Sequence, residues 1–111
     1  MALQKNFKYS NGTETNYHKV HEVKLVHESK VVVVENDDNT TEEVIDTSYK
    51  ISIQLYSYVS KEVRLVSEHN YLERNIIYGV RAADIVENSN IMMLAYEIVK
   101  DNDAFADAID V

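Results

Sequence analysis

The sequence contains no cysteine, no proline and no tryptophan, and it has only two glycines among its 111 residues. Without cysteine, neither a disulfide framework nor a thiolate zinc site can form, so we expect stability to come from packing or from association of subunits. Without proline, and with so little glycine, there is no sign of a flexible linker, and no internal repeat is found. The length then predicts a single domain over residues 1–111.

Long hydrophobic runs and a surplus of basic charge are also missing. No stretch approaches the roughly 18 apolar residues of a membrane span, and residues 1–8 hold no run that could serve as a secretion signal. We therefore expect a protein made in a cytoplasm, with no membrane partner. Nineteen acidic against eleven basic residues give a net charge of −8. Because such a charge repels phosphate backbones, we expect no nucleic-acid partner.

Hydrophobic residues make up 45% of the sequence and include eight tyrosines. This proportion is enough to form a hydrophobic core. Asn11-Gly12 predicts a two-residue hairpin turn, because this dipeptide tolerates positive φ angles. From Tyr17 to Val26 the apolar residues break a period of two, which predicts a strand with a bulge near His21 and Glu22. The polar, acidic residues 36–43 predict a mobile loop.

The second half holds the clearest periodic segments. Tyr49, Ile51, Ile53 and Leu55 alternate with polar residues and predict a half-buried strand, and residues 76–82 predict another, in which Gly79 marks a bulge or a close approach of the backbone. Residues 60–70 suit either a short helical turn or an irregular strand.

Residues 91–100 predict a helix, because their apolar side chains fall on one face and capping residues precede them. Phe105 and Ile109 lie four residues apart, so a further helical turn is expected to dock both on the core. The predicted fold class is α+β: an antiparallel sheet or small β-sandwich with one C-terminal helix packed on it.

Catalytic chemistry finds no support in the sequence. His18 and His21 would point to opposite faces of a strand and cannot share a metal ion without a bulge, so we interpret them and His27 as solvent-facing or core-edge residues. The Asp37-Asp38-Asn39 cluster lacks the spacing of a calcium loop. We expect no catalytic residue, metal, cofactor or small-molecule substrate, and the protein is predicted not to be an enzyme. A deep pocket with convergent polar groups would revive an enzymatic role.

Two sets of residues are candidates for protein contacts. Tyr56 and Tyr58 are predicted to lie on the solvent-facing side of their strand, where large amphipathic rings often mark a contact; ordinary surface tyrosines are the alternative. The second set is the β-branched run Val31, Val32, Val33 and Val34. It suits either a strand buried on both faces or a strand at a subunit contact.

The two ends of the chain resemble a known family. The segment from Met1 to Val20, with Asn11-Gly12 and Tyr17-His18-Lys19-Val20, resembles the start of small siphophage proteins from phages of Gram-positive bacteria such as Bacillus. Ala95–Lys100 and the acidic tail from Phe105 to Asp110 resemble that family's closing helix and end. The resemblance implies genes near those for the tail and lysis, and a fold similar to the shoulder domain of lactococcal phage receptor-binding proteins. The sequence departs from this pattern between Glu28 and Thr47, which is longer.

Two functional hypotheses follow. The first is a structural or assembly module of a phage tail or adsorption apparatus, which binds phage structural proteins or further copies of itself as a homo-oligomer and passes from the host cytoplasm into the virion tail. The alternative is an acidic host-takeover inhibitor that binds a host nucleic-acid-binding protein. It predicts that the carboxylates of residues 36–43 and of the C-terminal tail line up on one face.

Overall fold

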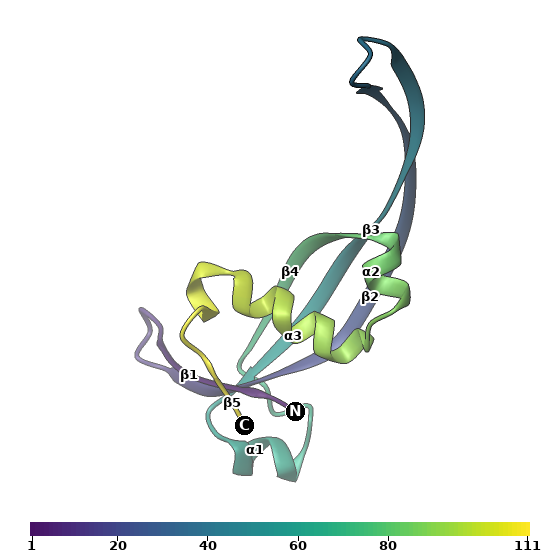
Figure 1. Ribbon diagram of the computed structural model, residues 1–111. Coiled ribbons are helices and arrows are strands. Elements are labelled where there is room, and N and C mark those ends of the chain that lie inside the picture. The colour runs from purple at the N-terminus through teal and green to yellow at the C-terminus, as the bar shows by residue number, and fades with distance from the viewer.

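Five strands form one antiparallel sheet in the order β4-β3-β2-β1-β5, in a computed structural model that describes residues 1–111 (Figure 1). The strands are β1 (Leu3–Lys8), β2 (Glu14–Glu35), β3 (Thr41–Tyr58), β4 (Glu73–Ala82) and β5 (Ile109–Asp110). The helices are α1 (Lys61–Val66), α2 (Ala83–Glu87) and α3 (Ile91–Asp101), followed by the 3-10 turn η1 (Asp103–Phe105). The predicted α+β class with an antiparallel sheet is confirmed. The second sheet of a sandwich is not present.

The β1–β2 hairpin closes with a three-residue turn in place of the predicted two-residue one. Only Gly12 has a positive φ, of 88°, and its N–H donates to the Tyr9 carbonyl at 3.0 Å. The side chain of Asn11 accepts from the N–H of Thr13 at 3.1 Å. A turn followed by one residue in the left-handed region is the usual form of a three-residue hairpin loop.

The β2–β3 hairpin repeats this turn with other residues. Asn39 takes the positive φ, of 66°, its N–H donates to the Asn36 carbonyl at 3.0 Å, and Asp38 accepts from the N–H of Thr40 at 3.1 Å. The predicted loop over 36–43 is therefore confirmed as a connection between two strands, but it is shorter than expected. Residues 36–40 form a closed turn, and the next three already belong to β3.

The predicted bulge near His21 is confirmed by a register shift of β2 against β3 between Val20 and Glu22. Just before it, β1 stops pairing with β2, since its last partner toward the bulge is His18. The Tyr96 hydroxyl supplies the hydrogen bonds that a neighbouring strand would otherwise make there. It accepts from the Val20 N–H at 3.0 Å and donates to the Met1 carbonyl at 2.8 Å.

One face of the sheet, here called the inner face, carries Ile51, Ile53 and Leu55 of β3, and these share a buried cluster with side chains of α3. The predicted helix over 91–100 is present as α3, and the Asn90 side chain caps it by accepting from the N–H of Met93 at 3.1 Å. Gly79 marks a close approach and not a bulge. A Cβ atom at this position would lie 2.7 Å from Cγ2 of Ile98.

The chain ends meet beside β1. The N–H of Ala2 donates to the Val111 carbonyl at 3.1 Å, and the N–H of Val111 donates to the Ala2 carbonyl at 3.0 Å. Phe105 is buried in the core cluster as expected. Ile109 is 64% exposed in β5, so the expectation that a helical turn would dock it is wrong.

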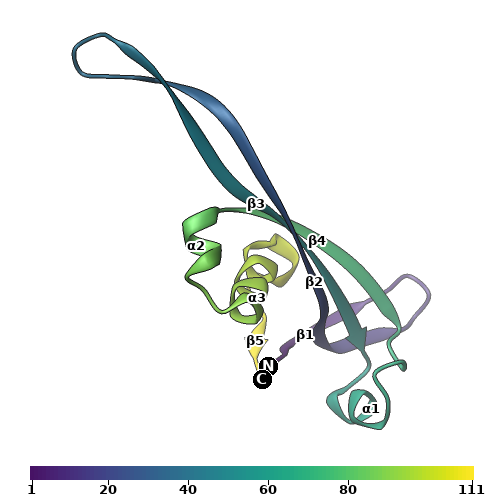
Figure 2. The same cartoon turned by 90° about the vertical axis from the view of Figure 1, so that its right-hand side faces the viewer.

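The β2–β3 hairpin extends far beyond the rest of the molecule (Figures 1 and 2). The last residue of β4, Ala82, pairs with Ser48, and past this point β2 and β3 pair only with each other. We call residues 28–47 the arm and the remainder the body. The molecule measures 60 × 24 × 21 Å, and its radius of gyration is 18.3 Å. A compact domain of this length has a radius of gyration of about 13 Å, so the arm dominates the shape. None of the helices is long and apolar enough to cross a membrane.

Candidate functional site

The arm exposes apolar side chains on both of its faces. Val31, Val33 and Ile45 lie on the continuation of the inner face and are 62%, 68% and 68% exposed. Val34 and Val44 are exposed on the opposite side, which we call the outer face. Burial of the valine run on both faces is therefore excluded within one chain. A role at a subunit contact stays a prediction, and exposed apolar residues on an unpaired ribbon favour such contacts.

The arm also carries most of the net charge. Its residues include seven acidic side chains and one basic side chain, Lys30, which gives −6 of the chain's −8. At the tip, the hydroxyl and N–H of Thr40 hold the pKa of Asp38 below its usual value, because they donate to the ionised carboxylate. These two hydrogen bonds keep a negative charge at the exposed tip of the arm.

The outer face of the body is the second apolar surface. Ile76, Tyr78 and Val80 of β4 are exposed there, Tyr78 by 75%, and Val26 lies in the same row as Val80, separated from it by Lys50. In Figure 2 both α2 and α3 lie on the other side of the strands. Ile76, Tyr78 and Val80 thus face solvent, whereas Ile77 is buried on the inner face and Gly79 faces α3.

Tyr56 and Tyr58 do not face solvent, and that prediction is wrong. Tyr58 is 1% exposed and donates from its hydroxyl to the Glu68 carbonyl at 2.7 Å, and burial raises its pKa. Tyr56 is 9% exposed and stacks on Tyr71 at 4.0 Å and on His21 at 4.1 Å, measured between ring centroids. The cause is the segment between β3 and β4, which contributes Tyr71 and α1 residues to a second small core on the outer face. Of the two alternatives for residues 60–70, a short helical turn or an irregular strand, the structure shows the helical turn, as α1.

His18 is fully buried, contrary to the prediction of a solvent-facing or core-edge residue. Its Nε2 lies 2.8 Å from the Lys5 carbonyl, and its Nδ1 lies 2.7 Å from the Ser57 hydroxyl. A carbonyl can only accept, so Nε2 carries the proton and the Ser57 hydroxyl donates to Nδ1. The rings of Phe7 and Phe105 meet the imidazole edge-on, and burial lowers its pKa. His18 is thus held neutral inside the core.

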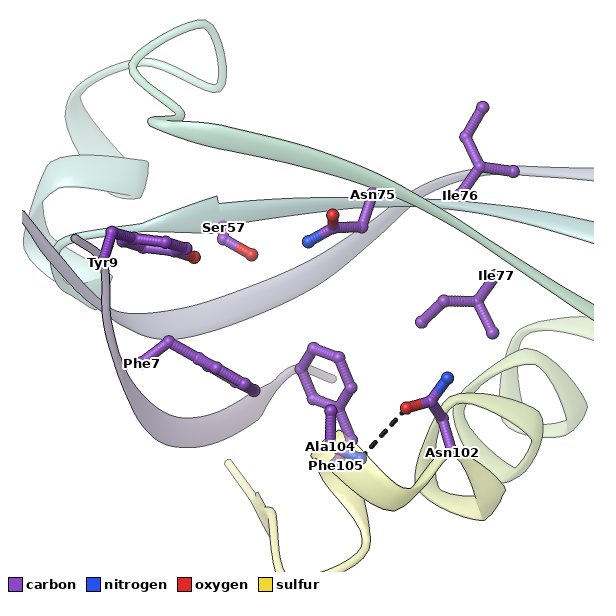
Figure 3. A pocket seen from close by; sticks show the side chains of 9 residues that line it. All are labelled: Phe7, Tyr9, Ser57, Asn75, Ile76, Ile77, Asn102, Ala104 and Phe105. Carbon is purple, nitrogen blue, oxygen red and sulfur yellow. Dashed lines mark hydrogen bonds between the residues drawn. The ribbon is translucent and has the colours of Figure 1, made fainter. Parts of the chain in front are cut away.

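A hollow of about 280 Å³ is lined in part by Phe7, Ser57 and Phe105, the three residues whose side chains contact this histidine (Figure 3). It is lined by Phe7, Tyr9, Ser57, Asn75, Ile76, Ile77, Asn102, Ala104 and Phe105. Three of its polar side chains already bond within the fold: Ser57 to His18, Tyr9 to Thr15, and Asn102 to the N–H of Ala104. The hydroxyl of Ser57, which is 1% exposed, is bonded to the imidazole and inaccessible to a substrate. The fourth polar side chain of the lining is that of Asn75 in β4.

The histidines also do not gather with carboxylates. No group of three or more His, Asp or Glu side chains is arranged to hold a metal ion. His18 is buried, whereas His21 and His27 are exposed along β2. The arm and the outer face of the body carry exposed apolar side chains that a partner could cover.

Comparison with known proteins returns no relative. The sequence matches no protein-family model and no curated protein, and the structure resembles no solved structure closely enough to count as a match.

Proposed function

We propose that this chain is a non-enzymatic structural or assembly module of a bacteriophage tail or adsorption apparatus, and that it acts through protein contacts made by its arm. The observation that carries the proposal is the exposure of Val31, Val33 and Ile45 on a ribbon of only two strands. An isolated two-stranded hairpin is marginally stable in water, and exposed apolar residues on strands with open edges favour association. The arm is therefore expected to be covered in the working assembly.

The phage assignment is supported by the segments that resemble siphophage proteins. These two segments lie together in the fold: Phe7 packs on Phe105 with ring centroids 5.0 Å apart, and Lys5 forms an ion pair with Asp107. The departing segment between Glu28 and Thr47 corresponds to the arm. On this proposal the body, with α3 packed on its inner face, is the shared part, and the arm adds a contact specific to this chain. The partners are tail proteins of the same particle or further copies of the chain.

The alternative, an acidic inhibitor that imitates nucleic acid, is less well supported by the geometry. It requires the carboxylates of residues 36–43 and those of the C-terminal tail to share one face. The two groups lie at opposite ends of the molecule, as both ribbon views make visible (Figures 1 and 2). A continuous acidic stripe of the kind that a DNA-binding protein would grip is therefore not formed by these residues.

The proposal is tested by a photo-crosslinking amino acid placed at Val33 in the phage that encodes the chain. The matched control is Leu65 of α1, an apolar residue of the body that is 70% exposed, close to the 68% of Val33. We expect Val33 to cross-link to a tail protein or to a second copy of the chain, and Leu65 to give neither product. Mass spectrometry of purified particles should detect the protein at a fixed copy number.

A shortened arm provides the second readout. Residues 31–45 are replaced by Asn-Gly, which joins the directly opposed Lys30 and Asp46 by a two-residue turn. The body should keep its fold, and the yield of infectious particles should fall. The proposal is wrong if Val33 gives no cross-link, or if the shortened chain supports a normal yield.

A further inference from the structure

The open edge of β2 is the longest unpaired backbone in the molecule. Its neighbour β1 pairs with it only as far as His18, and the Tyr96 hydroxyl takes the Val20 N–H. From Glu22 to Glu35 the strand has β3 on one side and no neighbour on the other. Such an edge is a template for another strand unless charges or bulges block it. The bulge at His21 ends the open edge on the side of the body.

The charges along this edge alternate in a self-complementary order. Glu22, Lys24, Glu28 and Lys30 occupy even positions and share the outer face with Val26, which lies midway between them. When the segment is laid antiparallel against a copy of itself, with Val26 facing Val26, Glu22 falls opposite Lys30 and Lys24 falls opposite Glu28. Opposite charges facing each other across an antiparallel pair are stabilising, and like charges are destabilising.

The charges select this alignment against its neighbours. Centring the two-fold axis on Leu25 brings Glu22 opposite Glu28, and centring it on His27 brings Lys24 opposite Lys30. Centring it on Lys24 or on Glu28 places that residue against its own copy. Of these five registers, only the one centred on Val26 pairs every charge with its opposite. The residues that guard the edge against other strands are therefore complementary to a second copy of the same strand.

The structure assigns the β2 edge to a homodimer. We propose that two copies pair antiparallel over residues 22–30 about an axis at Val26, which joins their sheets into one. A two-fold axis perpendicular to the sheet keeps the inner faces of the two copies on the same side. The pairing ends at Glu22, because the bulge between Val20 and Glu22 interrupts the edge there. Beyond residue 30, each arm continues toward the body of the other copy.

A symmetric disulfide tests the axis directly, because the natural chain has no cysteine. Opposed residues of antiparallel strands have Cα atoms about 4.5–5.5 Å apart, within the range that a disulfide spans. We expect Val26→Cys to form a covalent dimer on mild oxidation. The control is Val80→Cys, on the same face and 57% exposed against 49% for Val26. Equal cross-linking of the two variants, or none by Val26→Cys, would overturn the proposal.

Charge reversal provides an independent test by sedimentation equilibrium. Lys24→Glu places Glu opposite Glu28 twice per dimer, and Glu28→Lys places Lys opposite Lys24 twice, so each variant alone should self-associate about tenfold more weakly or worse. Mixed in equal amounts, the two variants have both contacts complementary and should form a one-to-one heterodimer. Lys61→Glu, in α1, should leave self-association unchanged. A mixture that associates no better than its components would refute the register.

The inference rests on the proposed function only in taking exposed β2 as a contact surface, and the two can fail separately. A chain that stays monomeric in sedimentation but cross-links from Val33 to another tail protein would sink the homodimer and keep the proposed function. A chain that forms the homodimer, but whose shortened-arm variant supports a normal yield of infectious particles, would keep the homodimer and sink the proposed function.

Discussion

We expect the natural protein to lose stability as the pH falls below about 6.5, and replacement of the buried His18 to reduce that loss. The imidazole is neutral in the folded state, because burial lowers its pKa and its Nδ1 accepts from Ser57. In the unfolded chain it titrates near its ordinary value of about 6.5. Below that pH the unfolded state binds one more proton than the folded state, so the free energy of unfolding falls with falling pH. Above that pH the contribution is fully present.

The size of the effect follows from the linkage. One proton taken up only on unfolding costs about 1.4 kcal/mol of stability per pH unit, so the loss between pH 6.5 and 5.0 is at most roughly 2 kcal/mol, and it stops where the buried ring itself becomes protonated. A small domain has a free energy of unfolding of about 5–15 kcal/mol, so the loss is readily measured. The ion pair between Lys5 and Asp107, close to His18, does not add to this pH dependence. Lys5 lowers the pKa of Asp107, which therefore stays ionised across this range.

The assay is urea unfolding followed by circular dichroism at several pH values from 7.5 to 5.0. His18→Gln keeps a donor for the Lys5 carbonyl and removes the titrating ring, and it should cost about 1–3 kcal/mol at pH 7.5 through poorer bonding of Ser57. Its stability should then fall less between pH 6.5 and 5.0 than that of the natural chain. The control His21→Gln changes an exposed ring and should keep the natural slope. Identical slopes for His18→Gln and the natural chain would refute the buried neutral imidazole.

Two further substitutions test how the body is closed. Gly79→Ala puts a Cβ atom 2.7 Å from Cγ2 of Ile98 and should destabilise the fold by about 1–3 kcal/mol in thermal unfolding. Ile98→Ala removes the clashing atom, so the double variant should lose less stability than the sum of the two single variants. Tyr96→Phe leaves the Val20 N–H and the Met1 carbonyl without their bonds and should cost about 1–3 kcal/mol in urea unfolding; an unchanged midpoint would mean that water replaces the hydroxyl.

Periodicity and local chemistry predicted the parts of the fold that depend on neighbouring residues. The bulge at His21 was readable because Val20 and Val23 cannot both keep a period of two. The helix α3 was readable from its apolar face and its Asn90 cap. Gly79 was readable as either a bulge or a close approach, and neither the choice between them nor the helix residue that it meets could be read from the sequence.

The misplaced tyrosines show what local patterns omit. Tyr56 and Tyr58 sit at even positions of β3, the side that is exposed along the arm and over much of the body. The segment between β3 and β4 folds back over this end of the strand and buries them. Nothing in the period-two pattern of a strand tells which part of its outer face will be covered by a later segment. The pattern alone could not separate these tyrosines from the exposed Tyr78.

The length of the arm was hidden for a related reason. Strand signals near Val31 and near Tyr49 were separate, and the polar residues between Val26 and Val31 suggested an interruption. In the structure they continue a single strand of 22 residues, because exposed polar side chains on a two-sided ribbon carry no burial pattern to read. His18 was misjudged in the same way, since its burial depends on Phe7, Phe105 and Ser57, which come from three other segments.

The division between body and arm determines how variants of this chain should behave. The body closes on itself: its ends bond to each other, and the main core cluster draws on no residue of the arm. Arm residues bury little in a single chain, so polar substitutions there remove little stabilisation from the monomer. Any large effect of Val31→Ser on assembly must then come from a lost contact with a partner and not from unfolding. Stability and association can therefore be separated in this chain by substitutions in different segments, which is what makes its contact surfaces accessible to experiment.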